Sequence, residues 1–182
     1  AVQKLYDFIW DQFCDWYIEL AKISLQGADS VIAQNTRQVL VWVMSNTLKL
    51  LHPFMPYITE EIWQTLPHEG EALIVSKWPE YDDGLVFEAE RTEMRRAMDA
   101  IRAVRVRRNE MNVPPSKKAS LFIATAYEDT FRKTLPFITR LAYAAEVSIG
   151  ESFDLPDAVN IVTNDARIYI PMDELVDKMI EE

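Results

Sequence analysis

Hydrophobic side chains recur every three or four positions through the first part of the chain, which is the spacing of amphipathic helices. This spacing predicts a helix over residues 3–24, a second over 32–51 and a third from Pro56 to Pro67. Proline suits the first turn of a helix, because the N–H it lacks would have no partner there. Three such helices with short connections between them predict an antiparallel bundle.

The pattern changes in the second half of the chain. Residues 79–87 mix proline, glycine and acidic residues, which is typical of a connector. Beyond it the expected elements are, in order, a long helix over 87–110, a strand around Leu121 and Ile123, a helical stretch over 128–142 interrupted by Pro136, a strand over 146–149, a hairpin over 159–170, and a helix from 173. The expected fold is therefore mainly α, with a helical bundle over 1–78, the connector, and a long helix plus a small α+β subdomain over 88–182.

Composition and net charge limit the kinds of ligand that the chain could bind. The chain has 182 residues, of which 49% are apolar, and a net charge of −10, which is the wrong sign for general attraction to nucleic acid. Residues 91–118 are an exception, because they hold nine Lys and Arg against three acidic residues. An acidic body with one basic element can contact phosphates locally.

The usual signatures of catalysis and metal binding are missing from the sequence. There is one cysteine, Cys14, and two histidines, with no metal-ligand spacing. No glycine-rich phosphate loop and no pairing of a nucleophile with a base is visible. We therefore predict no catalytic residue and no metal ligand in this chain. Most of the tryptophans are expected in the core; they are Trp10, Trp16, Trp42, Trp63 and Trp78.

The first helix carries one apolar residue on its polar side. At 100° per residue, its apolar stripe consists of Leu5, Ile9, Phe13, Trp16, Leu20 and Ile23. Ile18 lies instead among acidic and basic residues, and with Asp15, Glu19 and Lys22 it forms what we call the helix-one patch. A carboxylate can accept a hydrogen bond from a base amino group, and an apolar side chain can pack on a base. The patch is thus a candidate for RNA recognition, and a solvated face with one stray apolar residue is the alternative.

The long helix carries a stripe of arginines beside its apolar side, including Arg91 and Arg95. The candidates for phosphate contact are Arg102, Arg105, Arg108, Lys117 and Lys118. The alternative is that the arginine stems flank the core while their guanidinium groups meet the acidic remainder of the chain. Aromatic residues are missing from 91–118, so this segment is not a platform for base stacking.

Three stretches of this sequence resemble the C-terminal part of valyl-tRNA synthetases. The string WDQFCDWYIE (Trp10 to Glu19) resembles the helix that opens the last part of their anticodon-binding domain. LLHPFMPYITEEIW (Leu50 to Trp63) resembles a helix junction common to the valine, isoleucine and leucine enzymes. IRAVR followed by EMNVPPSKK (Ile101 to Lys118) again resembles the valine enzyme, although Val106 to Arg108 is more basic than is typical of this family.

The resemblance implies an anticodon-binding helical bundle of the class I synthetase type, with valine-accepting tRNA as its partner. It places Ile18 and Glu19 next to the last anticodon letter. It further implies that ATP and magnesium are used by a catalytic domain upstream in the same chain, that this segment itself needs no cofactor, and that a C-terminal coiled coil begins near residues 173–182. A cytoplasmic location without membrane contact follows from the same resemblance.

Two alternatives remain open from the sequence. The chain could be the equivalent region of an isoleucyl-tRNA synthetase, against which the string from Phe13 to Glu19 argues. It could instead be a helical interaction module that binds no RNA, in which case the acidic side of the first helix is ordinary solvated surface.

Overall fold

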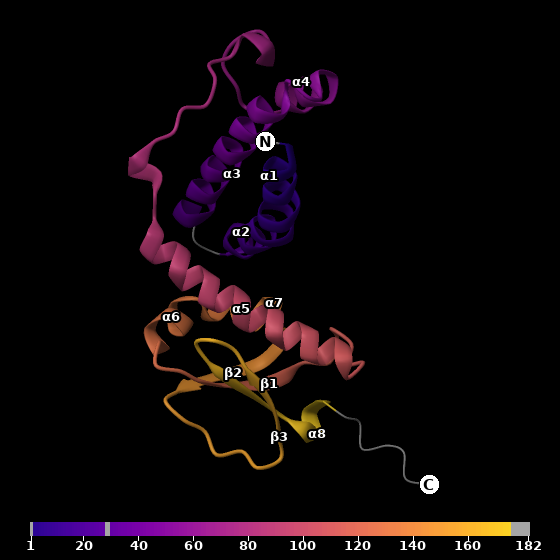
Figure 1. The fold of residues 1–182 in the computed structure, drawn as a ribbon, viewed down its shortest axis with the longest axis vertical. Helices are drawn as coiled ribbons and strands as arrows, with labels where there is room; N and C mark the ends of the chain where they lie inside the picture. Colours follow the sequence, from indigo (N-terminus) through magenta and orange to yellow (C-terminus); the bar gives the residue numbers. More distant parts are fainter. Residues whose placement is uncertain (1, 28–29, 176–182) are drawn as a thin grey trace. The chain divides into compact units, whose positions relative to one another are not determined.

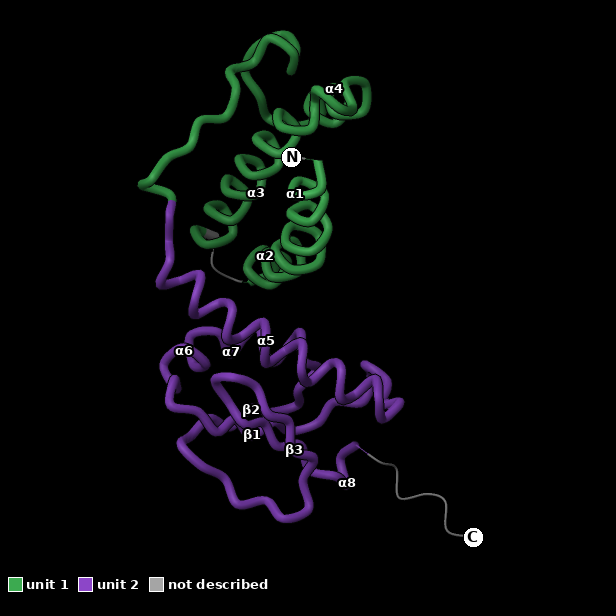
Figure 2. Tube along the Cα trace, viewed as in Figure 1, with its two compact units in different colours: residues 1–85 green, residues 86–182 purple. Residues whose placement is uncertain are grey.

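The computed structural model describes residues 2–27 and 30–175 of the chain. These residues form two compact units, Ala1–Leu85 and Val86–Glu182 (Figures 1 and 2). The first unit is helical, and the second combines helices with a four-stranded sheet.

The first predicted helix is confirmed, but its geometry is not uniform. It consists of α1 (Val2–Asp7), a π-helical segment η1 (Phe8–Tyr17) and α2 (Ile18–Gln26). At the junction, the Ile18 N–H donates to the Phe13 carbonyl, five residues back. A π-helix holds more residues per turn than an α-helix. The assumption of 100° per residue is therefore wrong over Phe8–Tyr17.

The next two helices follow the predicted pattern. They are α3 (Ser30–Leu51) and α4 (Pro56–Thr65), and Pro56 lies in the first turn of α4 as expected. The helix α2 packs against α3, and α3 packs against α4 (Figure 1). Two short 3₁₀ helices that were not predicted follow, η2 (Leu73–Val75) and η3 (Asp83–Leu85). A cluster of six side chains joins α3, α4, the residue after α4 and η2: Leu48, Trp63 and Leu73 are buried, with Met44, Ile62 and Leu66 around them.

Glu60 links α4 to η2. One oxygen of its carboxylate accepts a hydrogen bond from Gln64 Nε2 (2.8 Å), and the other accepts one from the Leu73 N–H (2.9 Å). The bond from Gln64, then that from Leu73, and the nearby His52 and His68 hold the pKa of the Glu60 carboxyl below its ordinary value, although desolvation opposes them. Glu60 thus serves structure in the first unit.

We expect the Glu60 carboxylate to stabilise the first unit only while it is ionised. Because its pKa is lowered by folding, its contribution is fully present above the ordinary glutamate range and is lost as the pH falls through the lowered pKa. Glu60→Gln should therefore reduce the melting temperature at pH 7, and the difference from wild type should shrink in acid. Tryptophan fluorescence measures this, with the exposed Glu61→Gln as control. A difference that stays constant from pH 7 to pH 3 would contradict the assignment.

The second unit begins with α5 (Glu88–Glu110), as predicted. The predicted strands and helices after it are also found, and the helical stretch around Pro136 is divided in two; the elements are β1 (Ala119–Ala124), α6 (Glu128–Lys133), α7 (Leu135–Leu141), β2 (Ala144–Gly150), β3 (Ala158–Val162), β4 (Arg167–Pro171) and α8 (Met172–Leu175). Of the expected last helix and coiled coil, residues 176–182 lie outside the described residues.

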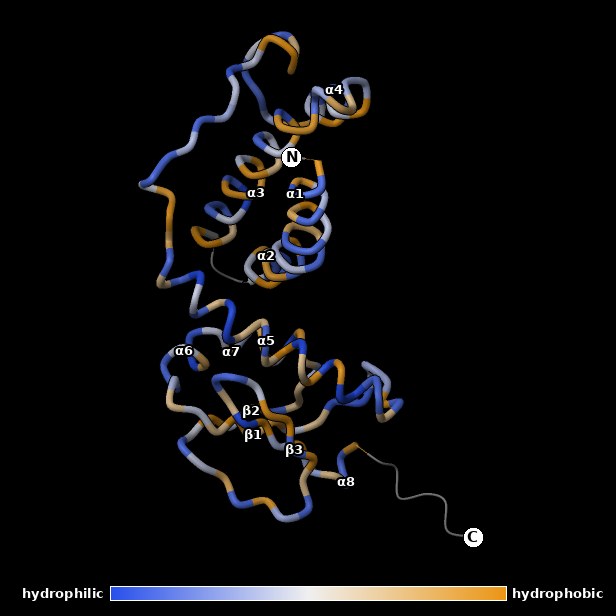
Figure 3. Tube along the Cα trace, viewed as in Figure 1, coloured by the Kyte–Doolittle hydropathy of each residue, from blue (hydrophilic) through white to orange (hydrophobic). Residues whose placement is uncertain are grey.

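The four strands form one mixed sheet in the order β2-β1-β4-β3. The strand β1 pairs with β2 in parallel and with β4 antiparallel, and β3 and β4 form the predicted hairpin. Because parallel strands need a crossover, α6 and α7 make the connection between β1 and β2. The helices α5, α6 and α7 pack on the sheet and on one another, and hydrophobic positions concentrate on the strands (Figure 3).

Burial alternates along β1, as expected of a strand with one face in a core. Its buried side chains Leu121 and Ile123 share this core with residues from α5, α6, α7 and β4; these are Ala97, Ala100, Ile101, Val104, Phe131, Ile138, Ile168 and Ile170. The second unit therefore has a complete hydrophobic core of its own.

The end of α5 has the hydrogen bonds of a Schellman cap. The Asn112 N–H donates to the Asn109 carbonyl (3.0 Å), and the Val113 N–H donates to the Arg108 carbonyl (2.9 Å). Asn112 has a φ of 55°, in the left-handed region, and Val113 is buried beneath it. Asparagine tolerates this conformation better than most residues that carry a Cβ.

Asn112 should therefore be sensitive to alanine but not to glycine. Asn112→Ala is expected to lower the free energy of unfolding by about 1 kcal/mol, because alanine is strained in the left-handed region. Asn112→Gly should be neutral or slightly stabilising. Urea unfolding followed by circular dichroism distinguishes the two, with Asn109→Ala on the exposed helix end as control. Equal losses for both Asn112 variants would contradict a backbone explanation.

Candidate nucleic-acid interface

The helix-one patch lies where the π-helical segment meets α2. Asp15 belongs to η1, Ile18 is the first residue of α2, and Glu19 and Lys22 follow within its first turns. The neighbouring Phe13 and Trp16 are buried, so they fix the orientation of this part of the helix against the unit. The four side chains of the patch therefore lie on a helical segment that is held in place by buried neighbouring residues.

The patch remains accessible to a ligand. Asp15 and Lys22 are exposed, and Ile18 is half-buried. Glu19 and Lys22 form an ion pair at 2.5 Å across one turn, with 41% and 48% of their side chains exposed. Such a surface pair contributes little to stability, so a ligand can compete for it at low cost.

The side chains of the patch offer complementary chemistry. The carboxylates of Asp15 and Glu19 accept hydrogen bonds, and the Lys22 ammonium donates them. Ile18 supplies apolar surface between these polar groups. A nucleobase presents the same combination of polar edge and apolar face, so the arrangement fits a single unpaired base.

Arg91, Arg102 and Arg107 of α5 each form an ion pair with an acidic residue on the same helix. Arg91 pairs with Glu88 at 3.1 Å, and Arg102 pairs with Asp99 at 3.1 Å. These pairs are exposed and each spans one turn. Of the other expected phosphate contacts, Arg102 and Lys118 are exposed and Lys117 is half-buried. Arg105 is half-buried, and its Nε donates to the Leu141 carbonyl (2.7 Å).

Arg108 differs from the other arginines, because only 2% of it is exposed. Its Nη2 donates to the Pro114 carbonyl at 3.1 Å and also to the Lys117 carbonyl, and its guanidinium lies 5.8 Å from the centre of the Tyr143 ring. Burial lowers the pKa of Arg108, while Tyr143 acts in the opposite direction. The expectation of a phosphate contact at Arg108 is therefore wrong, because its guanidinium holds the 111–118 loop from inside.

The expectation that most tryptophans are in the core is also wrong. Trp16 and Trp63 are buried, but Trp10, Trp42 and Trp78 are each more than half exposed. Trp42 lies on α3, away from the stripe that includes Leu40, Val43 and Thr47. The helical spacing alone places Trp42 off that stripe, and this was the available sign that it faces solvent.

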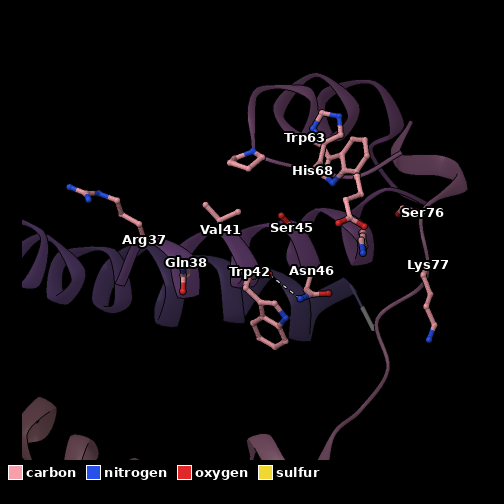
Figure 4. Close-up of a pocket in the computed structure, with 13 residues that line it drawn as sticks. Arg37, Gln38, Val41, Trp42, Ser45, Asn46, Trp63, His68, Ser76 and Lys77 are labelled. Carbon is pink, nitrogen blue, oxygen red and sulfur yellow. Dashed lines mark hydrogen bonds between the residues drawn. The ribbon is translucent and has the colours of Figure 1, made fainter. Parts of the chain in front are cut away.

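Trp42 borders a groove of about 710 Å³ in the first unit (Figure 4). The groove follows α3 and is bounded by α4, the turn after α4 and the residues after η2. Thirteen residues line it: Arg37, Gln38, Val41, Trp42, Ser45, Asn46, Lys49, Trp63, Pro67, His68, Glu69, Ser76 and Lys77. We call this the α3 groove; it was not predicted from the sequence.

Metal binding and membrane insertion can also be examined in the described part of the chain. Within residues 2–27 and 30–175, no three His, Cys, Asp or Glu side chains are grouped as a metal site would require. No helix in the described part of the chain combines the length and the apolar character that a bilayer span requires. His52 Nδ1 lies 2.8 Å from Thr59 Oγ1, and this contact joins the turn after α3 to α4.

Comparisons with known proteins agree with the resemblance noted in the sequence. A family model described as the anticodon-binding domain of tRNA ligase matches residues 1–123. The chain is 46% identical to a valine–tRNA ligase of Geobacillus kaustophilus over 99% of its length, and 44% identical to one of Listeria monocytogenes over 98%. It is 40% identical to one of Staphylococcus saprophyticus over 96%. It spans only 21% of the first two relatives and 20% of the third. The chain therefore belongs to the family of anticodon-binding domains of tRNA ligases.

Proposed function

We propose that this chain recognises the anticodon of valine-accepting tRNA as part of a valine–tRNA ligase. The observation that carries the proposal is the accessible helix-one patch, in a chain whose similarity to valine–tRNA ligases extends over nearly its whole length. The helices of the first unit would belong to an antiparallel anticodon-binding bundle. Residues 1–78 would form this part, 79–87 a connector, and 88–182 the subdomain that leads to a coiled coil.

The chemistry of the patch favours cytosine at the last anticodon position. Valine codons begin with G, so the anticodon letter that pairs with it is C, whereas isoleucine codons require U. Cytosine presents an amino group to which the Glu19 or Asp15 carboxylate can serve as acceptor, and uracil presents an oxygen that a carboxylate repels. Ile18 would pack on the face of the same base. Base contacts of this kind provide specificity, and phosphate contacts provide position.

Phosphate contacts would come from the accessible basic residues of the second unit. Arg102, Arg105, Lys117 and Lys118 remain candidates, and the exposed Lys118 is the most available of them. Each phosphate contact should make binding more salt-dependent. Because the net charge of the chain is −10, the chain as a whole does not attract RNA phosphates.

The wider activity is a proposal about the longer protein. In it a catalytic domain upstream would join valine to tRNA with ATP and magnesium, in the cytoplasm. The residues described here provide no glycine-rich phosphate loop and no metal-binding cluster, so no step of that reaction is assigned to them. Exposed apolar side chains on α3, α4 and the turn between them would contact such further domains; they include Val39, Phe54, Tyr57 and Ile58.

Titration with RNA hairpins tests the proposal. The 182-residue chain should bind a hairpin of the valine tRNA anticodon arm more tightly than the same hairpin with U at the last anticodon position. A difference of about tenfold is expected, since one base contact is worth 1–3 kcal/mol. Equal affinity for the two hairpins would exclude base recognition by this chain. If the chain bound neither hairpin at low salt, the result would contradict RNA recognition by this chain.

A further inference from the structure

The second unit has a pocket of about 420 Å³ on the face of its sheet that points away from the core. The register of the sheet places Val162, Arg167, Ala124 and Gly150 in one row across β3, β4, β1 and β2. The residues that alternate with this row along β3, β4 and β1 are buried in the core, so the row lies on the opposite face. Because alanine is small and glycine has no side chain, the row is low over β1 and β2, which leaves room for a ligand.

The rim of this sheet pocket is held by Thr125, the residue after β1. The Thr125 N–H donates to the Gly150 carbonyl at the end of β2 (3.0 Å), and the Thr125 hydroxyl donates to the Asp165 carbonyl between β3 and β4 (2.7 Å). The turn that contains Asp165 is closed by the Thr163 N–H, which donates to the Ala166 carbonyl (2.9 Å). Thr125 is itself buried. The walls of the pocket are therefore fixed in advance, which lowers the cost of ordering them around a ligand.

The sheet pocket carries two opposite charges that do not neutralise each other. Arg167 is the first residue of β4 and Glu151 follows the last residue of β2, and both side chains are exposed. Within residues 2–27 and 30–175, neither of them forms an ion pair with the other or with a further residue. The remaining acidic residue of the lining, Asp165, is paired with Arg96 of α5 at 3.6 Å. A single ligand that carries both a negative and a positive group would therefore satisfy both Arg167 and Glu151.

The rest of the lining is made of small side chains and suits a small molecule. Val162, Ala124 and Ala126 supply apolar surface, and Ser152 and Thr163 supply hydroxyl groups. Pockets for small ligands are commonly about 300–1,000 Å³, and the sheet pocket lies near the lower end of that range.

We propose that the sheet pocket binds a free α-amino acid with a small apolar side chain. Its carboxylate would accept hydrogen bonds from the Arg167 guanidinium, whose planar fork matches a carboxylate. Its ammonium would donate to the Glu151 carboxylate, and its side chain would pack against Val162 and the alanines. The proposal goes beyond anticodon recognition and does not depend on it, because the pocket includes none of the helix-one patch.

Nuclear magnetic resonance titration of the isotope-labelled 182-residue chain tests the ligand. L-alanine and L-valine should shift the amide signals of residues 124–126, 151–152 and 162–167. N-acetyl-L-alanine lacks the ammonium and L-alaninamide lacks the carboxylate, so each should bind about tenfold more weakly than L-alanine. If either derivative bound as tightly as L-alanine, one charge would suffice and the proposal would be overturned. The absence of shifts in these residues with both amino acids would also overturn it.

Substitution of the two charged residues tests their roles. Arg167→Gln and Glu151→Gln should each weaken binding of L-alanine about tenfold, because each removes one charged partner. Arg132→Gln and Glu146→Gln are the matched controls, since both residues are exposed in the same unit and do not line the pocket. They should bind L-alanine as the wild-type chain does. Circular dichroism melts show whether each variant is folded. Wild-type affinity in both Arg167→Gln and Glu151→Gln would overturn the assignment.

Discussion

Arg108→Ala should destabilise the second unit by about 3 kcal/mol, the largest effect expected for any charged residue in the chain. The substitution leaves the Pro114 and Lys117 carbonyls without their donor in a buried site. Hydrogen bonds to charged groups are worth about 1.5–3 kcal/mol each, and a cavity adds to the loss. Removal of a buried charge with two unpartnered nitrogens, Nε and Nη1, offsets part of this cost.

The positions of the tryptophans allow unfolding of the second unit to be distinguished from unfolding of the first. All five tryptophans precede residue 79, so their fluorescence reports on the first unit alone. The Arg108→Ala variant should show earlier loss of circular dichroism and faster amide exchange in β1 and β4. Arg107→Ala is the control, because Arg107 is partly exposed and pairs at the surface with Glu110. A variant at Arg108 with the stability of wild type would show that the 111–118 loop does not depend on its guanidinium.

Glu19→Lys should abolish the preference for C at the last anticodon position. The substitution replaces an acceptor by a donor, which suits the oxygen of uracil rather than the amino group of cytosine. We expect the ratio of the two affinities to change about tenfold or more, with U equal to or better than C. Ile18→Ala should weaken binding of both hairpins without altering their ratio, because contact with the face of a base does not distinguish its edge.

Asp11→Lys is the control for this experiment. It makes the same change in charge on the same helix, at an exposed position outside the patch. Both lysine variants should strengthen binding through reduced repulsion, but only the Glu19 variant should alter the ratio. An equal change of ratio in the two variants would mean that charge alone, and no base contact, controls discrimination.

Much of the fold follows from the sequence, because its helices and strands have clear periods. The boundaries of α3, α4 and α5 lie close to those expected, since proline and the amphipathic spacing mark them. The pairing of β1 with β4 depends on contacts across more than forty residues, which no local pattern contains. The π-helical segment is likewise hidden, because the choice between four-residue and five-residue backbone hydrogen bonds has no signature in the order of apolar and polar residues.

The candidate functional surface was harder to predict than the fold. The helix-one patch was found because Ile18 is apolar among charged neighbours, and this anomaly is visible in one helix. The burial of Arg108 was not visible, because its partners are backbone carbonyls, which have no sequence signature. The α3 groove combines residues from α3, α4 and the segments after it, so its charge and its exposed Trp42 became apparent only in three dimensions.

The most direct test of the central claim is to locate the last anticodon base on the protein. A valine anticodon hairpin with a photoreactive cytosine at that position can be crosslinked to the 182-residue chain, and the modified peptide identified by mass spectrometry. The account predicts a crosslink within residues 15–22. Excess unmodified valine hairpin should abolish this crosslink, whereas the same excess of the hairpin with U at the last anticodon position should not. A crosslink confined to the second unit, or to α3 with none on the first helix, would contradict it.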